Sequence, residues 1–160
     1  MTPSHAIETE IKLRIPAPAA VEPALRAAGF VQEQPSVLDQ SVLWDHANAL
    51  RAAGCALRLR RYAGMALLTW KGAKLADPVL KIRPEIETSI GDAGAMEQIL
   101  RELGFVPVLA MEKRRALWRS DRLLACVDEA PFGCFLELEG DPADIREAMA
   151  LLGLSASDAE

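Results

Sequence analysis

The sequence predicts an α+β protein built on an eight-stranded antiparallel closed β-barrel with a charged interior, covered outside by helices. Three observations predict this fold class. Most predicted strands alternate charged and apolar residues with a period of two, which puts each kind on its own face. Three amphipathic helices are available to cover an apolar outer face. The order strand–helix–strand–strand–strand occurs twice, and eight strands are enough to close a small barrel.

The size of the chain fits one domain. Its 160 residues fall within the range of about 100–200 that single domains usually hold. We therefore expect one domain over 1–160, with a core over about 6–153 and a flexible tail over 154–160.

Composition and charge exclude several classes of protein. There are 23 acidic and 18 basic residues, and a formal net charge of -5 argues against nucleic acid as a partner. The three cysteines, Cys55, Cys126 and Cys134, form no CxxC pair, so we expect reduced thiols. No signal peptide and no long apolar run are apparent, so the sequence predicts a cytoplasmic protein without a membrane segment.

The first half of the chain begins with a strand over residues 6–15, in which charged and apolar side chains alternate. Pro16 and Pro18 end this strand, and a helix over 19–28 ends at Gly29. After it we expect strands at 37–44, 55–62 and 65–71, with an irregular stretch around 45–54 and a loop over 73–80.

The second half repeats this order. Residues 81–88 alternate again, Asp92 can cap a helix over 93–103, and Gly104 ends that helix. The remaining expected elements are strands at 110–119, 122–129 and 134–139 and a last helix over about 142–152.

Charged residues occupy every second position of most predicted strands, and two interpretations of this pattern compete. Each strand can be half-buried with its charges in water, as in an ordinary antiparallel sheet. Alternatively the charged face is the inside of a barrel. Like-charged neighbours repel, and a shared ligand would explain them. The inward set would hold seven acids and seven bases, namely Glu8, Glu10, Glu85, Glu87, Asp128, Glu137 and Glu139 with Lys12, Arg58, Arg60, Lys71, Arg83, Lys113 and Arg115.

So many charges require a hydrated tunnel, because each desolvated unpaired ion costs several kcal/mol. Carboxylates in such a tunnel suit Mg²⁺ or Mn²⁺, and lysine and arginine suit phosphate groups. This interpretation predicts that six of the side chains point into one cavity, namely Glu8, Glu10, Arg58, Arg60, Glu137 and Glu139.

These residues resemble the motifs of the CYTH family, also called triphosphate tunnel metalloenzymes. Six motifs stand in family order over about 8–140: ExExK at 8–12, LRxR at 57–60, TxKG at 69–72, RxExE at 83–87, KxR at 113–115, and Asp128 with ExE at 137–139. The chain departs from the family at YxDT, where it has Leu43-Trp44-Asp45-His46, and no substrate-binding role is carried over to that segment.

The resemblance implies a triphosphate and a divalent metal ion, Mg²⁺ or Mn²⁺, bound in the tunnel. It also implies roles for the residues. Glu8, Glu10, Asp128, Glu137 and Glu139 would bind the metal. Lys12, Arg58, Arg60, Lys71, Arg83, Lys113 and Arg115 would bind phosphate oxygens. Lys12 would bind phosphate or help to position the attacking water, and the catalytic residues would be Lys12, Glu8 and Glu10. Glu85 and Glu87 would orient the bases or assist a second metal.

The family contains inorganic triphosphatases, thiamine triphosphatases and class IV adenylate cyclases, and it is compatible with a homodimer. We expect hydrolysis of tripolyphosphate or a related triphosphate, since no adenine or ribose pocket is evident in the sequence. A cyclase that converts ATP to cyclic AMP and pyrophosphate is one alternative, and a non-catalytic polyphosphate- or nucleotide-binding module is another. Trp44 either stacks on an organic substrate or packs against a helix.

Overall fold

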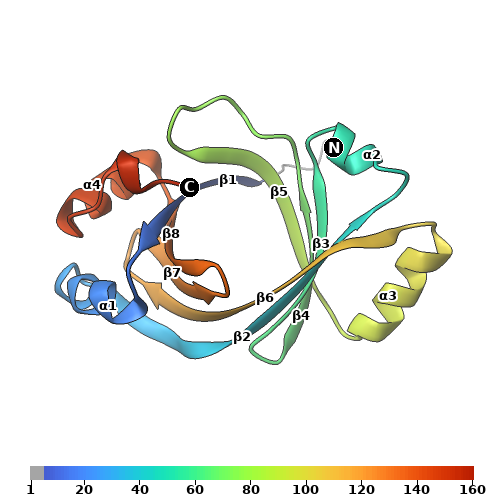
Figure 1. The fold of residues 1–160 in the computed structure, drawn as a ribbon, viewed down its shortest axis with the longest axis horizontal. Coiled ribbons are helices and arrows are strands. Elements are labelled where there is room, and N and C mark those ends of the chain that lie inside the picture. The colour runs from blue at the N-terminus through green and yellow to red at the C-terminus, as the bar shows by residue number, and fades with distance from the viewer. Residues whose placement is uncertain (1–5) are drawn as a thin grey trace. The chain divides into compact units, whose positions relative to one another are not determined.

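The computed structural model describes residues 6–160, and its eight strands form a closed antiparallel barrel (Figure 1). The strand order around the barrel is β1-β5-β4-β3-β2-β6-β7-β8. This architecture confirms the predicted fold class. The strands are β1 (Ala6–Ile15), β2 (Val31–Asp45), β3 (Ala56–Tyr62), β4 (Met65–Lys71), β5 (Lys81–Ile90), β6 (Val106–Arg119), β7 (Leu123–Ala130) and β8 (Gly133–Gly140).

The three predicted helices are present, and one short helix was not predicted. The helices are α1 (Pro18–Ala27), α2 (Ala49–Ala52), α3 (Ala93–Glu102) and α4 (Pro142–Leu151), with a 3-10 turn, η1, at Ala156–Asp158. The additional helix, α2, lies in the stretch expected to be irregular. No helix within residues 6–160 combines the length and the hydropathy that crossing a membrane requires.

The two halves end their first helices in the same way. Gly29 and Gly104 adopt left-handed φ angles of 85° and 83°. The backbone N–H of Phe30 donates to Leu25 O at 3.0 Å, and that of Phe105 donates to Leu100 O at 2.9 Å. A glycine in this conformation lets the chain close the helix with a bond from C″ to C3, which explains the repeated Gly-Phe pair.

Two compact units divide the chain, and each is described by itself. Unit 1 contains Leu38–Leu75 and Arg83–Glu112, together with the start of β1. Unit 2 contains Glu8–Val37, Ala76–Ile82 and Lys113–Glu160.

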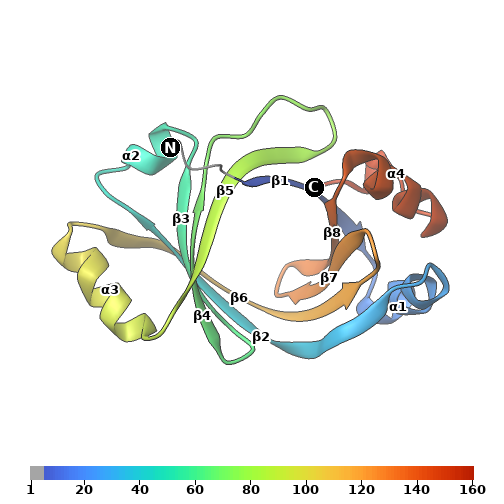
Figure 2. The same cartoon turned by 180° about the vertical axis from the view of Figure 1, so that it is seen from behind.

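The core of unit 2 lies between helices α1 and α4 and one face of the sheet β6-β7-β8-β1. Figures 1 and 2 show the two helices beside β7 and β8. The buried residues come from every second position of the strands, as the period-two pattern predicted. The strands contribute Ile11, Leu13, Ile15, Ala116, Trp118, Leu123, Ala125, Val127, Leu136 and Leu138, and the helices contribute Val21, Leu25, Ile145, Ala148 and Met149.

The core of unit 1 is smaller and lies under α3. Trp44 is 2% exposed and packs with Leu59 of β3 and Leu100 of α3. The guanidinium carbon of Arg101 lies 5.1 Å from the Trp44 ring centre. Trp44 therefore packs against a helix, and the alternative in which it stacks on a substrate is wrong.

Strand β2 begins at Val31, six residues before the expected start, and β6 begins at Val106, four residues before. The early part of β2 is polar and contains Pro35, so its sequence alone does not indicate a strand. Long-range bonds to β6 hold it. Arg119 Nε lies 2.8 Å from Glu33 Oε1, and Arg114 Nη2 donates to Ser36 O at 2.7 Å.

The last residues, expected as a flexible tail, make specific contacts with β1. Ala159 forms an isolated bridge with Leu13, and the Glu160 N–H donates to Lys12 O at 2.9 Å. A capping box between Ser155 and Asp158 stabilises η1.

Candidate active site

Unit 2 carries a row of charges on the face opposite its core, which we call the acidic ladder. Its strand register pairs Glu10 with Glu139 and Lys12 with Glu137 across β1 and β8. Paired residues in antiparallel strands project to the same face, and in a closed barrel the face opposite the covering helices is the inner one. Arg14 continues this face of β1. The candidate residues on the ladder are five acids and three bases: Glu8, Glu10, Asp128, Glu137 and Glu139 with Lys12, Lys113 and Arg115.

Asp128 is the most enclosed member of the acidic ladder. It is fully buried, and its two oxygens accept from Nε and Nη2 of Arg115, both at 2.6 Å. Lys113 Nζ donates to Asp128 Oδ2 at 2.6 Å. A carboxylate engaged by two cations stabilises a buried ion cluster. Asp128 therefore holds these two bases, and its predicted metal-binding role stays a prediction.

Glu137 joins the same cluster from β8. It accepts from Arg115 Nη2, and its Oε1 lies 3.7 Å from Lys12 Nζ and 3.9 Å from Lys113 Nζ. Burial alone would raise the pKa of Glu137. The charges of Arg115, Lys113 and Lys12 outweigh burial and lower the pKa to about 2. The carboxyl is consequently ionised at neutral pH.

The remaining acids gather toward one end of this ladder. Glu10 and Glu139 face each other across neighbouring strands, and Glu8 is the next residue of β1 on that face. Carboxylates directly opposite each other repel unless a cation lies with them. Residues 6–160 contain no group of three His, Cys, Asp or Glu side chains arranged to hold a metal ion. Mg²⁺ usually takes only one or two carboxylates together with substrate phosphates, so this donor set fits it.

Unit 1 carries the second row of charges, the basic ladder, on the face opposite the α3 core. The strand register pairs Arg58 of β3 with Thr69 of β4, and Thr69 in turn with Glu87 of β5. It also pairs Lys71 with Glu85. This ladder has more bases than acids: Arg58, Arg60, Lys71 and Arg83 with Asp39, Glu85 and Glu87.

Arg60 is held by a residue that sequence reasoning missed. Asp39 Oδ1 accepts from Arg60 Nε at 3.0 Å, and Oδ2 accepts from Nη2 at 2.7 Å. Asp39 is 2% exposed and Arg60 is 8% exposed. The period-two pattern of β2 could have identified Asp39. Asp39 lies on the same face of β2 as Leu43, and Leu43 is paired with Arg58 across the strands, so Asp39 and the arginines share one face.

The other bases of the basic ladder have different surroundings from one another. Arg58 Nη2 lies 3.6 Å from Glu87 Oε2, and Thr69 Oγ1 donates to that oxygen at 2.6 Å. Lys71 Nζ lies 2.5 Å from Glu85 Oε2. The Arg83 side chain makes no hydrogen bond or ion pair with the residues that the structure describes. Glu85 and Glu87 thus lie beside Lys71 and Arg58, and their predicted orienting role stays a prediction.

Comparison with known proteins decides the family. The model of the CYTH domain matches residues 6–152. This chain belongs to the CYTH family. CYTH proteins are enzymes of the triphosphatase and adenylate cyclase kind, and they use divalent metal ions.

Several relatives agree with this assignment. The protein named "Putative adenylate cyclase MJ0240" from Methanocaldococcus jannaschii is 34% identical over 142 residues, which cover 88% of this chain and 81% of that protein. A solved structure from Vibrio parahaemolyticus, described as "a putative adenylate cyclase", has a TM-score of 0.84 at 19% identity. The match covers 98% of this chain and 94% of that chain. The Hippeastrum protein HpAC1, described as having a dominant triphosphatase activity, has a TM-score of 0.67 at 21% identity, with 92% and 88% covered.

The segment where this CYTH chain departs from the family's YxDT motif has a structural role. The Asp45 carboxylate accepts from the backbone N–H groups of His46 at 2.7 Å, Leu50 at 2.9 Å and Arg51 at 3.0 Å. Burial would raise the pKa of Asp45, but these three hydrogen bonds lower it. Asp45 thereby organises the α2 turn, in which Ala47 and Asn48 have positive φ angles.

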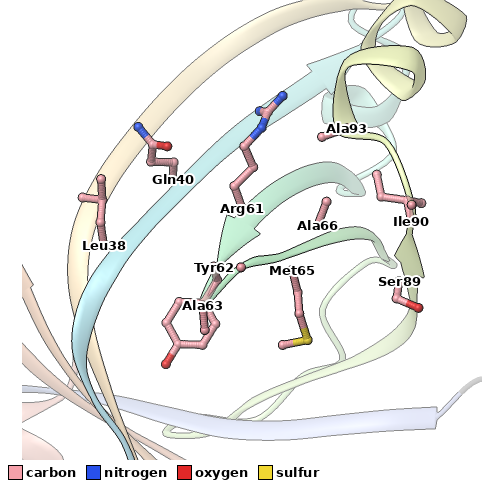
Figure 3. Close-up of a pocket in the computed structure, with 12 residues that line it drawn as sticks. Leu38, Gln40, Arg61, Tyr62, Ala63, Met65, Ala66, Ser89, Ile90 and Ala93 are labelled. Carbon is pink, nitrogen blue, oxygen red and sulfur yellow. The ribbon is translucent and has the colours of Figure 1, made fainter.

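Unit 1 of this CYTH chain also has a groove of about 620 Å³, whose lining residues include Leu38, Gln40, Arg61 and Ile90 (Figure 3). On their strands these four residues lie on the face that carries the core, and the basic ladder lies on the opposite face. No candidate residue of the basic ladder lines the groove in the part of the chain that the structure describes. The groove is therefore separate from the predicted site residues.

Proposed function

We propose that this chain hydrolyses a triphosphate, inorganic tripolyphosphate or a related organic triphosphate, with Mg²⁺ or Mn²⁺. The observation that carries the proposal is that each ladder gathers candidate charges on one strand face. The bases Arg58, Arg60, Lys71 and Arg83 lie on the basic ladder, and the facing carboxylates Glu10 and Glu139 lie on the acidic ladder with Glu8. A metal–triphosphate complex has the matching chemistry, since phosphate oxygens suit arginine and lysine and a hard cation suits carboxylates.

In this proposal the basic ladder binds the phosphate groups. Arg58, Arg60, Lys71 and Arg83 donate to nonbridging oxygens, and fixed donors of this kind stabilise the charge that develops during phosphoryl transfer. The hydroxyl of Thr69 donates to the Glu87 carboxylate and fixes it beside Arg58. Glu87 in turn limits the motion of the Arg58 guanidinium. Preorganisation matters because the donors then need no rearrangement in the transition state.

In this proposal the acidic ladder holds the metal through one or two of the carboxylates of Glu8, Glu10 and Glu139, together with phosphate oxygens of the substrate. The metal, when bound, polarises phosphoryl oxygens and neutralises their charge. Lys12 lies next to these acids on the same face, with its ammonium 4.2 Å from the Phe135 ring centre. From this position Lys12 would donate to a phosphate oxygen or orient the attacking water. Lys113 and Arg115 would contribute further phosphate contacts from the cluster with Asp128 and Glu137.

Adenylate cyclase activity is the second candidate, because the Methanocaldococcus jannaschii relative carries that name at 34% identity. Both activities require the same triphosphate contacts. They differ in the nucleophile, which is water in the hydrolase and the ribose 3′-hydroxyl in the cyclase. The products therefore separate the two candidates.

One assay tests the proposal and its alternatives. The purified protein is incubated with Mg²⁺ or Mn²⁺ and tripolyphosphate, ATP or thiamine triphosphate, and the products are separated by ion exchange. We expect orthophosphate release from at least one substrate, and its loss in Glu8→Ala and Glu10→Ala. Glu129→Gln is the matched control, because Glu129 is an exposed carboxylate next to Asp128 on β7.

Three results would contradict the proposal. Cyclic AMP with pyrophosphate from ATP would favour the cyclase. Tight tripolyphosphate binding without turnover would favour a binding module. Phosphate release that survives both glutamate substitutions would show that the acidic ladder does not hold the metal.

A further inference from the structure

We propose that Asp39 is a positioning residue, which orients Arg60 so that one edge of its guanidinium group is presented to a phosphate group. The inference rests on the proposed function and adds to it a residue that belongs to none of the six motifs. Asp39 lies on β2, outside every motif that identified the candidate site.

The geometry of the pair is bidentate and side-on. Both oxygens of Asp39 are used, one by Nε and one by Nη2 of Arg60. The guanidinium carbon also lies over the Tyr62 ring, 4.5 Å from the ring centre. A carboxylate and an aromatic ring together fix both the direction and the plane of the guanidinium group.

This arrangement leaves a defined set of donors. A guanidinium group has five N–H bonds, and Asp39 takes one on Nε and one on Nη2. The second N–H of Nη2 and both N–H bonds of Nη1 remain. These groups form the end-on edge, which matches two oxygens of a phosphate group.

The similar pair in unit 2 differs in the use of the arginine's Nη2. Asp128 binds Arg115 by the same two nitrogens, but Arg115 Nη2 also donates to Glu137. The end-on edge of Arg115 is thus half used by a protein carboxylate. Asp39 leaves the corresponding edge of Arg60 available, which is why we assign the positioning role to Asp39.

The neighbouring pair Arg61–Glu97 supplies a control. Arg61 follows Arg60 on β3 but projects to the opposite face, and Figure 3 shows it directed away from Tyr62. Arg61 Nη2 lies 2.7 Å from Glu97 Oε1 of α3, and both side chains are partly exposed. A similar ion pair on the other face allows the role in catalysis to be separated from a general effect of losing a carboxylate.

The test is a double-mutant cycle on tripolyphosphate hydrolysis with Mg²⁺, with the folded fraction of each variant measured by circular dichroism. Asp39→Asn should lower kcat/KM by about 10- to 100-fold, the scale expected when a binding group is misplaced by about an ångström. In the Arg60→Ala background the same substitution should change kcat/KM by less than about threefold, because the proposed effect of Asp39 on phosphate binding requires the Arg60 guanidinium. Glu97→Gln should match the wild type.

The outcomes are distinct. Absence of turnover by the wild type overturns both the proposed function and this inference. Turnover by the wild type that Asp39→Asn leaves unchanged, or a loss of equal size with and without Arg60, overturns the inference alone. If Asp39→Asn does not fold because it leaves Arg60 buried and unpaired, Asp39→Glu, which displaces the carboxylate by one methylene, takes its place in the same cycle.

Discussion

The pH dependence of stability should change when Glu137 is replaced by Gln. Glu137 is ionised in the folded chain because Arg115, Lys113 and Lys12 surround it, and only 16% of its side chain is exposed. Its pKa falls from an ordinary value of 4.5 to about 2. A lowered folded-state pKa contributes stability above the unfolded pKa, and this stability is lost as the pH falls from about 4.5 toward 2.

The size of the effect follows from the pKa difference. Each pKa unit corresponds to about 1.4 kcal/mol, so the difference contributes about 3 kcal/mol to the free energy of unfolding at pH 7. At pH 3 less than half of this contribution remains, because the unfolded group is then protonated while the folded group is still mostly ionised. Glu137→Gln removes the titrating group, so its destabilisation should be about 3 kcal/mol at pH 7 and should shrink as the pH falls.

Urea denaturation followed by tryptophan fluorescence, at several values between pH 7 and pH 3, measures this difference. The matched control is Glu97→Gln, whose partly exposed pair with Arg61 should contribute less than about 1 kcal/mol at every pH. A destabilisation by Glu137→Gln that stays constant across this range would refute the assignment of Glu137 as an ionised member of a buried cluster.

Three further predictions concern the core, the metal and the thiols. Trp118→Ala removes a ring that is 1% exposed and should lower the free energy of unfolding by about 3–5 kcal/mol in urea denaturation; a loss under about 1 kcal/mol would contradict the packing of unit 2. Chelation with EDTA should abolish triphosphate hydrolysis, and Mg²⁺ or Mn²⁺ should restore it; activity that persists in the chelator would exclude a metal role for the acidic ladder. Burial raises the pKa of the Cys126 thiol to about 12, and the charges of Glu137 and Asp128 raise it further. At pH 8 a disulfide reagent should therefore modify Cys55 and Cys134 well before Cys126. Rapid reaction of all three thiols in the native protein would contradict the burial of Cys126.

The sequence predicted much of the fold because the period-two pattern is local. Alternation of charge and apolar residues assigned the faces of β1, β3, β4 and β8, and glycines marked the ends of α1 and α3. The early part of β2 was missed because its stability comes from partners on β6, such as Arg119 for Glu33. The short helix α2 was missed because four residues are too few to show a helical period, although each favours a helix. Hydrogen bonds from its backbone to the Asp45 carboxylate hold it in place.

The candidate site was predicted at the level of residues but not of pairing. The motifs named Arg60 and Asp128, yet spacing along the chain does not say which acid meets which base. Asp39 accepts hydrogen bonds from Arg60, and it lies on β2, the strand that lacks the family's YxDT motif. Asp128 accepts hydrogen bonds from Arg115 and Lys113. Such pairings depend on strand register, which long-range contacts determine.

Isothermal titration tests the central claim, that the basic ladder binds phosphate groups and the acidic ladder binds the metal ion. Wild type, Arg58→Ala and Glu10→Gln are each titrated with tripolyphosphate in the absence of metal and with Mn²⁺ in the absence of phosphate. We predict that Arg58→Ala weakens tripolyphosphate binding at least about tenfold and leaves Mn²⁺ binding unchanged, and that Glu10→Gln does the reverse. Equal effects of each substitution on both ligands, or no effect on either, would contradict this division of roles.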